Sequence, residues 1–431
     1  MSKNDRNLIL NPGEYNLDVM TLVSYNGFTI DLRSNLVELV ICESVDSACL
    51  AGYLTIGENV NLPFHVPLIG NEKLLIQMTT PSRDTPIVAE FFIYKLDSKL
   101  SLDTNEKVNI YSLFFTSEAS ITNKKTKISR SYSNMTYAEM VYSLCIDHLG
   151  ITKDVFVSPT LGKKNMVFPF MSPVSAINLL AGRSVSSDHK QYTYMFYETL
   201  DAFWFAPLIP QTKDPVATYQ YYIANQSTGT QSFKDIEKDF KRIESYHVMK
   251  HNDTLEHLEN GVFAARMLTH DITKKTYQNY DYSYNDDFYN LHTMTGKGIL
   301  PNNGDVFSNF NYAHYSYYPK HSFSYSGVEN NDEYEIFALK RRAHLNHFRT
   351  GRMQIVVAGD SNRRVGDLVE AKIFAGQARL DSGDDPYDPY LSGKYLVSEV
   401  THILQKNQYK MKLTLERDSL PIPYPETKVV E

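Results

Sequence analysis

The sequence predicts a mainly β protein that also contains a small α+β module. Three observations lead to this prediction. Short runs of β-branched and apolar residues, separated by turn-forming residues, fill 35–118. A second series of such runs follows from residue 242 onward, and two capped helices lie between the two series. A chain of 431 residues is long enough for several domains, each with its own core.

The first series has connections that are too short for parallel crossovers. The strands are therefore expected to be antiparallel. The expected strands are 36–44 (LVELVICES), 49–57 (CLAGYLTIG), 71–78 (NEKLLIQM), 89–96 (AEFFIYKL) and 107–115 (KVNIYSLFF).

Two helices and a hairpin come next. Thr136 and Glu139 have the spacing of a capping box, and Gly150 is expected to end that helix. Ser172 is an expected N-cap, followed by Pro173 at the first helical position. The stretches YTYMFY and AFWFAPL, joined by ETLD, predict a hairpin, so that the middle of the chain forms an α+β module.

The second series repeats the layout of the first. Alternation is clearest in the final strand, where Tyr409, Met411, Leu413 and Leu415 share one face. The alternative, that any two β domains look alike at this level, stays open. The expected correspondences are 242–250 with 36–44, 259–271 with 49–57, 365–374 with 71–78, 393–400 with 89–96, and 408–416 with 107–115.

A polar, tyrosine-rich segment interrupts the second series and is followed by a helix carrying Ile336, Leu339 and Ala343 at helical spacing. The segment is either a loop packed by its own rings or a contact surface, since tyrosine gives large contact area at low entropic cost. We favour the contact surface. The residues expected to touch a partner are Tyr282, Tyr284, Tyr315, Tyr317, Tyr318 and Tyr424.

Composition and charge exclude several classes of protein. A net charge of −7 argues against a nucleic-acid binder. Cys42, Cys49 and Cys145 lack metal-ligand spacing and are expected to be reduced, buried thiols in a protein made in the cytosol. The N-terminal residues show no secretory signal, and no run of about 18 apolar residues predicts a membrane anchor.

No motif of catalysis is present. The sequence lacks a G-x-S-x-G elbow, a Walker A loop and an H-E-x-x-H helix. His251 and His257 do not have helical ligand spacing and are expected at the surface or at a helix cap. The acidic run around Asp381, Asp384, Asp385 and Asp388 lacks the Gly and Glu of a calcium loop and is expected to be a solvated turn. We therefore predict no catalytic, cofactor-binding or metal-binding residue, although an enzyme is not excluded.

Three stretches carry a resemblance to a known family. The stretch LVELVICESVDSACLAGYLTI with GNEKLLIQM resembles the opening tube-like barrel of the central baseplate hub proteins of contractile-tailed bacteriophages. FPFMSPVSAINLLAGRSVSS with YMFYETLDAFWFAPL is similar to their helix-then-hairpin module, and EIFALKRRAHLNHF through GKYLVSEVTHIL is similar to their closing barrel. These hubs are related to phage late control protein D and to the hub part of type VI secretion spikes. The turn Leu200-Asp201-Ala202, where Asp-Gly is expected, departs from the pattern.

The resemblance implies two tube-like antiparallel β-barrels per chain and a homotrimer whose six barrels form a pseudo-sixfold ring. Such a ring would sit in the virion tail baseplate after assembly in the host bacterial cytoplasm. Its implied partners are the central spike, the tail tube, the baseplate wedge proteins and the tape measure protein, with DNA passing through but not specifically bound. The expected domains are 1–134 (first barrel), 135–215 (α+β module), 216–275 with 335–420 (second barrel and helix), 276–334 (insertion) and 421–431 (extended tail).

Two alternatives remain at this point. One is the hub of a phage-like contractile injection particle, which would have the same architecture and a different cargo. The other is a tail-associated protein that binds or cleaves glycans, with the tyrosine-rich segment as its sugar platform.

Overall fold

The fold is known from a computed structural model. It describes residues 12–59, 68–102, 108–209, 215–223, 239–250, 253–298, 314–320, 334–375, 386–406 and 408–422.

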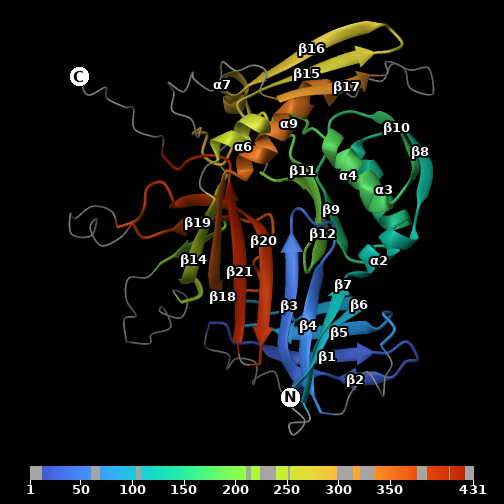
Figure 1. The fold of residues 1–431 in the computed structure, drawn as a ribbon, viewed down its shortest axis with the longest axis vertical. Coiled ribbons are helices and arrows are strands. Elements are labelled where there is room, and N and C mark those ends of the chain that lie inside the picture. The colour runs from blue at the N-terminus through green and yellow to red at the C-terminus, as the bar shows by residue number, and fades with distance from the viewer. Residues whose placement is uncertain are drawn as a thin grey trace.

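Within these residues, thirteen strands form one large sheet, which occupies the lower half of the molecule in Figure 1. Its order is β14-β18-β21-β20-β3-β4-β7-β6-β5-β1-β2, with β19 beside β20 and β13 beside β19. The N-terminal strands are β1 (Asn16–Val23), β2 (Thr29–Asp31), β3 (Leu36–Ser44), β4 (Ala51–Glu58), β5 (Lys73–Thr79), β6 (Ile87–Leu102) and β7 (Val108–Thr116). The C-terminal strands are β13 (Tyr219–Tyr222), β14 (Ile243–Lys250), β18 (Gly351–Ala358), β19 (Leu368–Lys372), β20 (Gly393–Gln405) and β21 (Gln408–Arg417).

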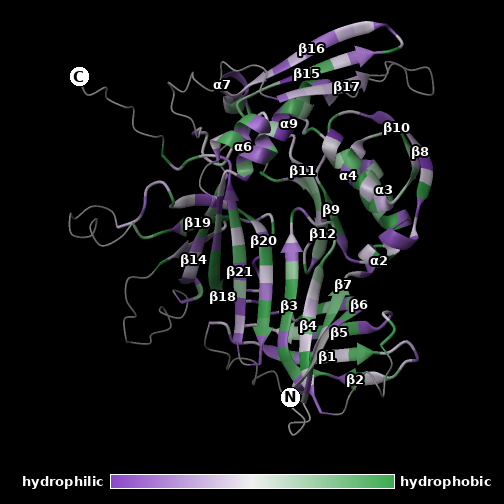
Figure 2. Ribbon diagram, viewed as in Figure 1, coloured by the Kyte–Doolittle hydropathy of each residue, from purple (hydrophilic) through white to green (hydrophobic). Residues whose placement is uncertain are grey.

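The prediction of a mainly β, antiparallel protein is confirmed. Hydrophobic and hydrophilic residues alternate along the long strands, as Figure 2 shows, because successive side chains point to opposite faces. The apolar faces of the two halves pack into one continuous core, which contains Leu39 and Ile41 of β3 together with Val400 and Leu404 of β20. The two β modules therefore share one sheet and one core.

The two halves of this sheet repeat each other strand by strand. The order β3-β4-β7-β6-β5 in the first half matches β14-β18-β21-β20-β19 in the second. The register matches as well: Phe92 of β6 pairs with Lys73 and Thr116, while Leu396 of β20 pairs with Leu368 and Glu416. The expected correspondences of β5 with β19, β6 with β20 and β7 with β21 are thus confirmed.

Irregularities of the strands also recur at equivalent positions. A bulge skips Tyr94 in the pairing of β6 with β7, and a bulge skips Ser398 in the pairing of β20 with β21. A second pair of bulges lies at Val37 in β3 and Glu244 in β14. Bulges are specific features of a strand pair, so their shared positions point to a duplicated unit.

One expected correspondence is wrong. The sequence predicts that 259–271 corresponds to 49–57, but its strand β15 (Ala264–Asp271) pairs with β16 (Thr276–Ser283) and β17 (His314–Lys320) in a separate sheet. The place equivalent to β4 is taken by β18. The alternating pattern of β15 is real, but alternation does not choose the pairing partner. The boundary expected at 275/276 consequently falls inside the β15–β16 hairpin.

The upper end of the molecule is formed by this small sheet with its helices (Figure 1). Helix α9 (Tyr334–Phe348), predicted from its apolar spacing, packs against β15 and β16 through Ala338, Leu339 and Ala343. The remaining elements here are α6 (Thr254–Glu259), α7 (Tyr284–Asp287) and the 3-10 turn η3 (Phe288–Asn290). A further 3-10 turn, η2 (Arg33–Asn35), precedes β3.

The α+β module lies to one side of the large sheet and has its own core. Its predicted capping box at Thr136 and Glu139 and its N-cap at Ser172 are both present. Residues 118–135 also belong to this core through Ala119, Ile128 and Tyr132, so the module starts earlier than expected. Its elements are α2 (Glu118–Lys125), β8 (Ile128–Met135), α3 (Tyr137–Asp147), β9 (Asp154–Val157), β10 (Lys164–Met171), α4 (Pro173–Arg183), β11 (Tyr194–Glu198) and β12 (Ala202–Pro207).

Candidate functional site

The two halves of the sheet meet where β20 pairs antiparallel with β3. Seven residue pairs form this junction, from Glu399 opposite Ser44 to Gln405 opposite Glu38. At its centre, Val400 and Leu404 are fully buried. This internal junction shows how one half of the repeat docks onto the other.

A buried carboxylate, Glu43 of β3, connects three parts of the chain at the junction. It is 2% exposed. Its Oε1 accepts a hydrogen bond from the Leu200 backbone N–H at 2.8 Å, and its Oε2 accepts one from the Val365 N–H at 3.2 Å. Glu43 therefore binds the α+β hairpin and the β18–β19 loop to the first half of the sheet.

His402 of β20 lies beside this carboxylate. Its Nδ1 is 2.8 Å from the Tyr409 hydroxyl oxygen, and its Nε2 is 3.6 Å from Glu43 Oε1. Both His402 and Tyr409 have no exposed surface, and burial raises the pKa of Tyr409 well above its usual value. The tyrosine hydroxyl consequently stays protonated, and together with the histidine it fixes the spacing of β20 and β21 under the junction.

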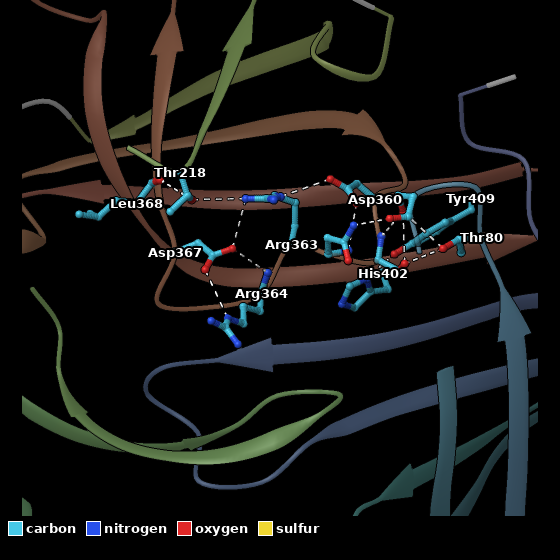
Figure 3. Close-up of polar contacts among 12 residues, drawn as sticks. Thr80, Thr218, Asp360, Arg363, Arg364, Asp367, Leu368, His402 and Tyr409 are labelled. Atoms are coloured by element: carbon cyan, nitrogen blue, oxygen red, sulfur yellow. Dashed lines mark hydrogen bonds and ion pairs between the residues drawn. The ribbon is translucent and has the colours of Figure 1, made fainter. Parts of the chain in front are cut away.

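The loop 359–367 between β18 and β19 reaches across to the first half (Figure 3). The Ser361 and Thr80 hydroxyl oxygens are 2.5 Å apart, and the Ser361 N–H donates to the Ser82 hydroxyl at 3.2 Å. Asn362 donates from its side chain to the Ser82 carbonyl. The loop is thus attached to the β5–β6 turn of the other half.

Two arginines of the same loop pair with carboxylates of the loop and stack on aromatic rings outside it. Arg363 lies between Asp360 and Asp367, at 3.3 Å from each carboxylate, and its guanidinium stacks 4.5 Å from the Tyr219 ring centre. Arg364 pairs with Asp367 and stacks over Trp204 of the α+β module at 4.5 Å. Burial raises the pKa of Asp367 although both arginines oppose that shift. The two arginines thus connect the second half of the sheet with the α+β module, and Figure 3 shows their ion pairs with Asp360 and Asp367.

A second buried carboxylate, Glu198 of β11, attaches the α+β module to the first half of the sheet. It is 1% exposed, accepts from the Leu50 N–H at 2.9 Å and pairs with Lys153 at 2.7 Å. Glu43 and Glu198 therefore both attach the α+β module to the first half of the sheet, and Glu43 also attaches the second half to the first through Val365, as expected for a scaffold whose parts keep fixed angles.

The outer edges of the large sheet contrast with the internal junction. In the part of the chain that the structure describes, β14 is the last strand on one side, and residues 94–97 of β6 pair only with β7. Apolar side chains are exposed at both edges: Tyr94 by 51%, Leu96 by 40% and Tyr246 by 44%. These edges are the surfaces most in need of a partner.

The six tyrosines expected to touch a partner are separated by the structure. Tyr282 and Tyr284 are buried, and their rings pack inside this chain against the α9 side. A partner contact does not fit these two residues, because they already fill the core. Tyr315 and Tyr317 are each 54% exposed on β17, and Tyr318 is half-buried against Tyr334. For these three a contact role stays a prediction, while Tyr424 lies outside the described residues.

Two further expectations are corrected. Cys42 is exposed rather than buried, because it lies on the outer face of β3; it, Cys49 and Cys145 are free thiols. His257 is buried instead of lying at the surface, with its Nε2 2.9 Å from the Thr350 hydroxyl, and burial lowers its pKa.

Four residues considered as metal ligands lie outside the described residues: His251, Asp381, Asp384 and Asp385. The described residues contain no group of three or more His, Cys, Asp or Glu side chains able to hold a metal ion, and no described helix is long and apolar enough to cross a membrane.

Comparison with solved structures gives the fold a context. The tail protein from Neisseria meningitidis MC58 aligns with a TM-score of 0.56 at 11% identity, over 94% of this chain and 97% of that one. The 43 kDa tail protein of prophage MuSo2 from Shewanella oneidensis aligns with a TM-score of 0.53 at 10% identity, over 94% of this chain and all of that one. The chain shares its fold with these two tail proteins.

A component of the type VI secretion system of E. coli also aligns, with a TM-score of 0.44 at 8% identity, over 96% of this chain and 79% of that one. No protein-family model matches the sequence, and comparison with curated proteins finds no match.

Sequence patterns missed the residues that hold the junction. Glu43 is the only acidic residue among the last five residues of the strand LVELVICES, and its side chain is buried. A charged residue in such an apolar run is a usable signal of a buried polar partner. The Arg363–Arg364–Asp367 group carries no such signal, since charged residues in a turn are ordinary.

Proposed function

We propose that the chain is the structural hub of a phage tail baseplate, forming a homotrimeric ring between the sixfold tail tube and the threefold central spike. The observation that carries this proposal is the duplication in register, with β3-β4-β7-β6-β5 repeated as β14-β18-β21-β20-β19. The fold shared with two tail proteins supports a role in a tail.

The duplication supports the ring through symmetry. Interfaces in a closed assembly repeat, and each surface patch must meet its complement. Three chains that each carry the surface twice present six near-equivalent surfaces to a sixfold tube, while the three α+β modules and insertions keep threefold symmetry for a spike. The buried contact of Glu43 with Val365 and that of Thr80 with Ser361 would hold the two halves at the fixed angle that such a ring requires.

The remaining partners follow from this position. The ring would contact the tail tube, the spike, the baseplate wedge proteins and the tape measure protein, and would enclose a channel through which DNA passes without specific binding. The protein would act by assembly rather than by catalysis. It would be part of the virion tail, assembled in the host bacterial cytoplasm. A contractile injection particle would use the same ring around a different cargo, and DNA content of purified particles separates these two cases.

The test is the solution mass of the purified protein, measured by light scattering on a sizing column over a dilution series. The proposal predicts a species of three times the 49.4 kDa chain mass. A monomer at every concentration would contradict the ring.

One surface favours a second candidate, a glycan-binding role. Tyr277, Tyr315 and Tyr317 are each more than half exposed on the β15–β16–β17 sheet, and His270 stacks on Tyr277 at 4.2 Å. Exposed rings on a sheet suit stacking against sugars. Binding to purified host polysaccharide that is lost in a Tyr315→Ala, Tyr317→Ala double variant would support this candidate, and absence of binding by the unaltered protein would remove it.

A further inference from the structure

The duplication assigns a partner to two free edges of the large sheet, the outer side of β14 and the part of β6 that extends past β5. Within the chain, the last part of β20 pairs with β3. The equivalent of β20 is β6, and the equivalent of β3 is β14. Both equivalents are free at the corresponding edges in the described part of the chain, β6 over residues 94–97 and β14 along its outer side.

The match extends to single backbone hydrogen bonds. The Val397 N–H donates to the Asp367 carbonyl at 2.9 Å, and the Ile93 N–H donates to the Glu72 carbonyl at 2.9 Å. Directly after these bonds, β20 leaves β19 and turns its edge to β3. Up to Asp97, the same edge of β6 thus offers a strand the same geometry; the register shift between Asp97 and Leu100 has no counterpart in β20.

Burial differs sharply between the equivalent positions. Val400 is fully buried in the internal junction, whereas its equivalent Leu96 is 40% exposed. Leu39 is fully buried, whereas its equivalent Tyr246 is 44% exposed. The free edges therefore keep apolar side chains at the positions that the internal junction covers.

We propose that β6 of one copy pairs antiparallel with β14 of a second copy, in the register that joins β20 to β3 within the chain. This inference rests on the proposed ring and names the contact that closes it. The occupant of each edge is a second copy of this chain, because the internal junction already shows both surfaces docked together.

The register predicts one specific ion pair between copies. Thr401 lies opposite Cys42 in the internal junction. Asp97 holds the position in β6 that Thr401 holds in β20, because β6 pairs with β7 in the register in which β20 pairs with β21. Lys250 holds the position in β14 that Cys42 holds in β3, because their strand partners, Arg352 and Ala51, are themselves equivalent. Asp97 of one copy then faces Lys250 of the next, and opposite charges meet across the strands.

Both charges have local partners in the single chain. Asp97 lies 2.9 Å from Lys95, and Lys250 pairs with Glu256 and lies 3.9 Å from Asp253. The proposed contact adds an opposite charge to each pair and places no like charges directly opposite. The pair is expected to set register and partner choice more than affinity.

The experiment is disulfide trapping in the full-length chain. Asp97→Cys and Lys250→Cys are combined with Cys42→Ser, so that the exposed native thiol cannot compete. Mild oxidation followed by a non-reducing gel should give covalent dimers and trimers of the double variant. Each single cysteine variant should remain at the mass of one chain, because one of the two partner thiols is missing.

The matched control uses the internal junction. Thr401→Cys, with the native Cys42 opposite, should form a disulfide within the chain, since directly opposite strand residues lie in the distance range of a disulfide. This control shows that the register itself permits the bond.

Charge reversal is the second measurement. Asp97→Lys should raise the dissociation constant of the trimer at least about tenfold, because two lysines then face each other. Combining it with Lys250→Asp should restore the trimer to within about threefold of the original.

The outcomes separate the two proposals. A trimer with the 97–250 disulfide supports both. A trimer that forms no such disulfide, while the Thr401→Cys control does, would overturn the β6–β14 pairing and leave the ring standing. A monomer with no covalent oligomer would overturn both.

Discussion

The internal junction and the outer edges of the large sheet are built from equivalent strands, yet the first is buried and the second is exposed. At the junction, β20 and β3 share a core and a buried carboxylate. At the outer edges, β6 and β14 present apolar side chains to solvent. With the proposed β6–β14 pairing, the single chain makes one of the two contacts of its repeat, and the other forms only between copies.

The largest effect is expected from a charge placed at equivalent positions of the two surfaces. Val400→Asp buries an unpaired carboxylate in the junction and should lower the free energy of unfolding by about 4 kcal/mol or more. Leu96→Asp at the exposed edge should change it by less than about 0.5 kcal/mol while abolishing the trimer. Urea unfolding and light scattering measure the two effects. Equal destabilisation by both variants would contradict the difference in burial between the junction and the outer edge.

The next effect concerns the carboxylate that holds the junction. Glu43→Ala leaves the buried Leu200 and Val365 N–H groups without their acceptor and should lower the free energy of unfolding by about 3 kcal/mol. Glu38→Ala on the same strand, more exposed, is the control and should cost under about 1 kcal/mol. A neutral Glu43 variant, measured by urea unfolding, would show that the modules are joined by other contacts.

A difference in charge between the halves predicts a pH dependence. Burial raises the pKa of Glu416 to about 7, against the opposing charge of Arg352, while the equivalent residue Thr116 does not titrate. Because the folded-state pKa is raised, this contribution to stability is complete below about pH 4.5 and is lost as the pH rises through 7. The loss should be about 3 kcal/mol, and Glu416→Gln should remove it. An unchanged pH profile of unfolding in that variant would contradict the assignment.

The smallest effect tests a difference in packing. Gly52 of β4 lies against the Val40 carbonyl and Phe115, where an added Cβ would be 2.6 Å from the Phe115 ring, whereas its equivalent in β18 is the buried Met353. Gly52→Ala should therefore lower the free energy of unfolding by about 1 to 2 kcal/mol through overpacking. Gly57→Ala on the same strand, whose nearest neighbour would be 3.4 Å away, should be within about 0.5 kcal/mol of the original. Thermal unfolding of both variants checks the contrast.

Much of the local structure could be predicted from the sequence. Alternating strands, the capping box at Thr136, the N-cap at Ser172 and the helix at 334–348 follow from side-chain period and backbone hydrogen bonding within a few residues. The doubling can also be predicted, since three strand pairs follow one another in the same order in both halves.

Pairing over long distances could not be predicted. The pattern of 264–271 fits a strand of the large sheet as well as it fits its actual place beside β16 and β17, because both environments bury one face. Likewise, tyrosine content did not separate Tyr282, which is buried against α9, from Tyr315, which is exposed. The junction depends on contacts between residues about 300 positions apart, such as Ser361 with Thr80, which no local pattern encodes.

The most direct test of the central claim is cryo-electron microscopy of the purified full-length protein at a resolution that traces strands. We expect a closed ring of three copies in which β6 of each copy pairs with β14 of the next, as β20 pairs with β3 within a chain. A ring in which both edges face solvent, or copies joined through another surface, would contradict it.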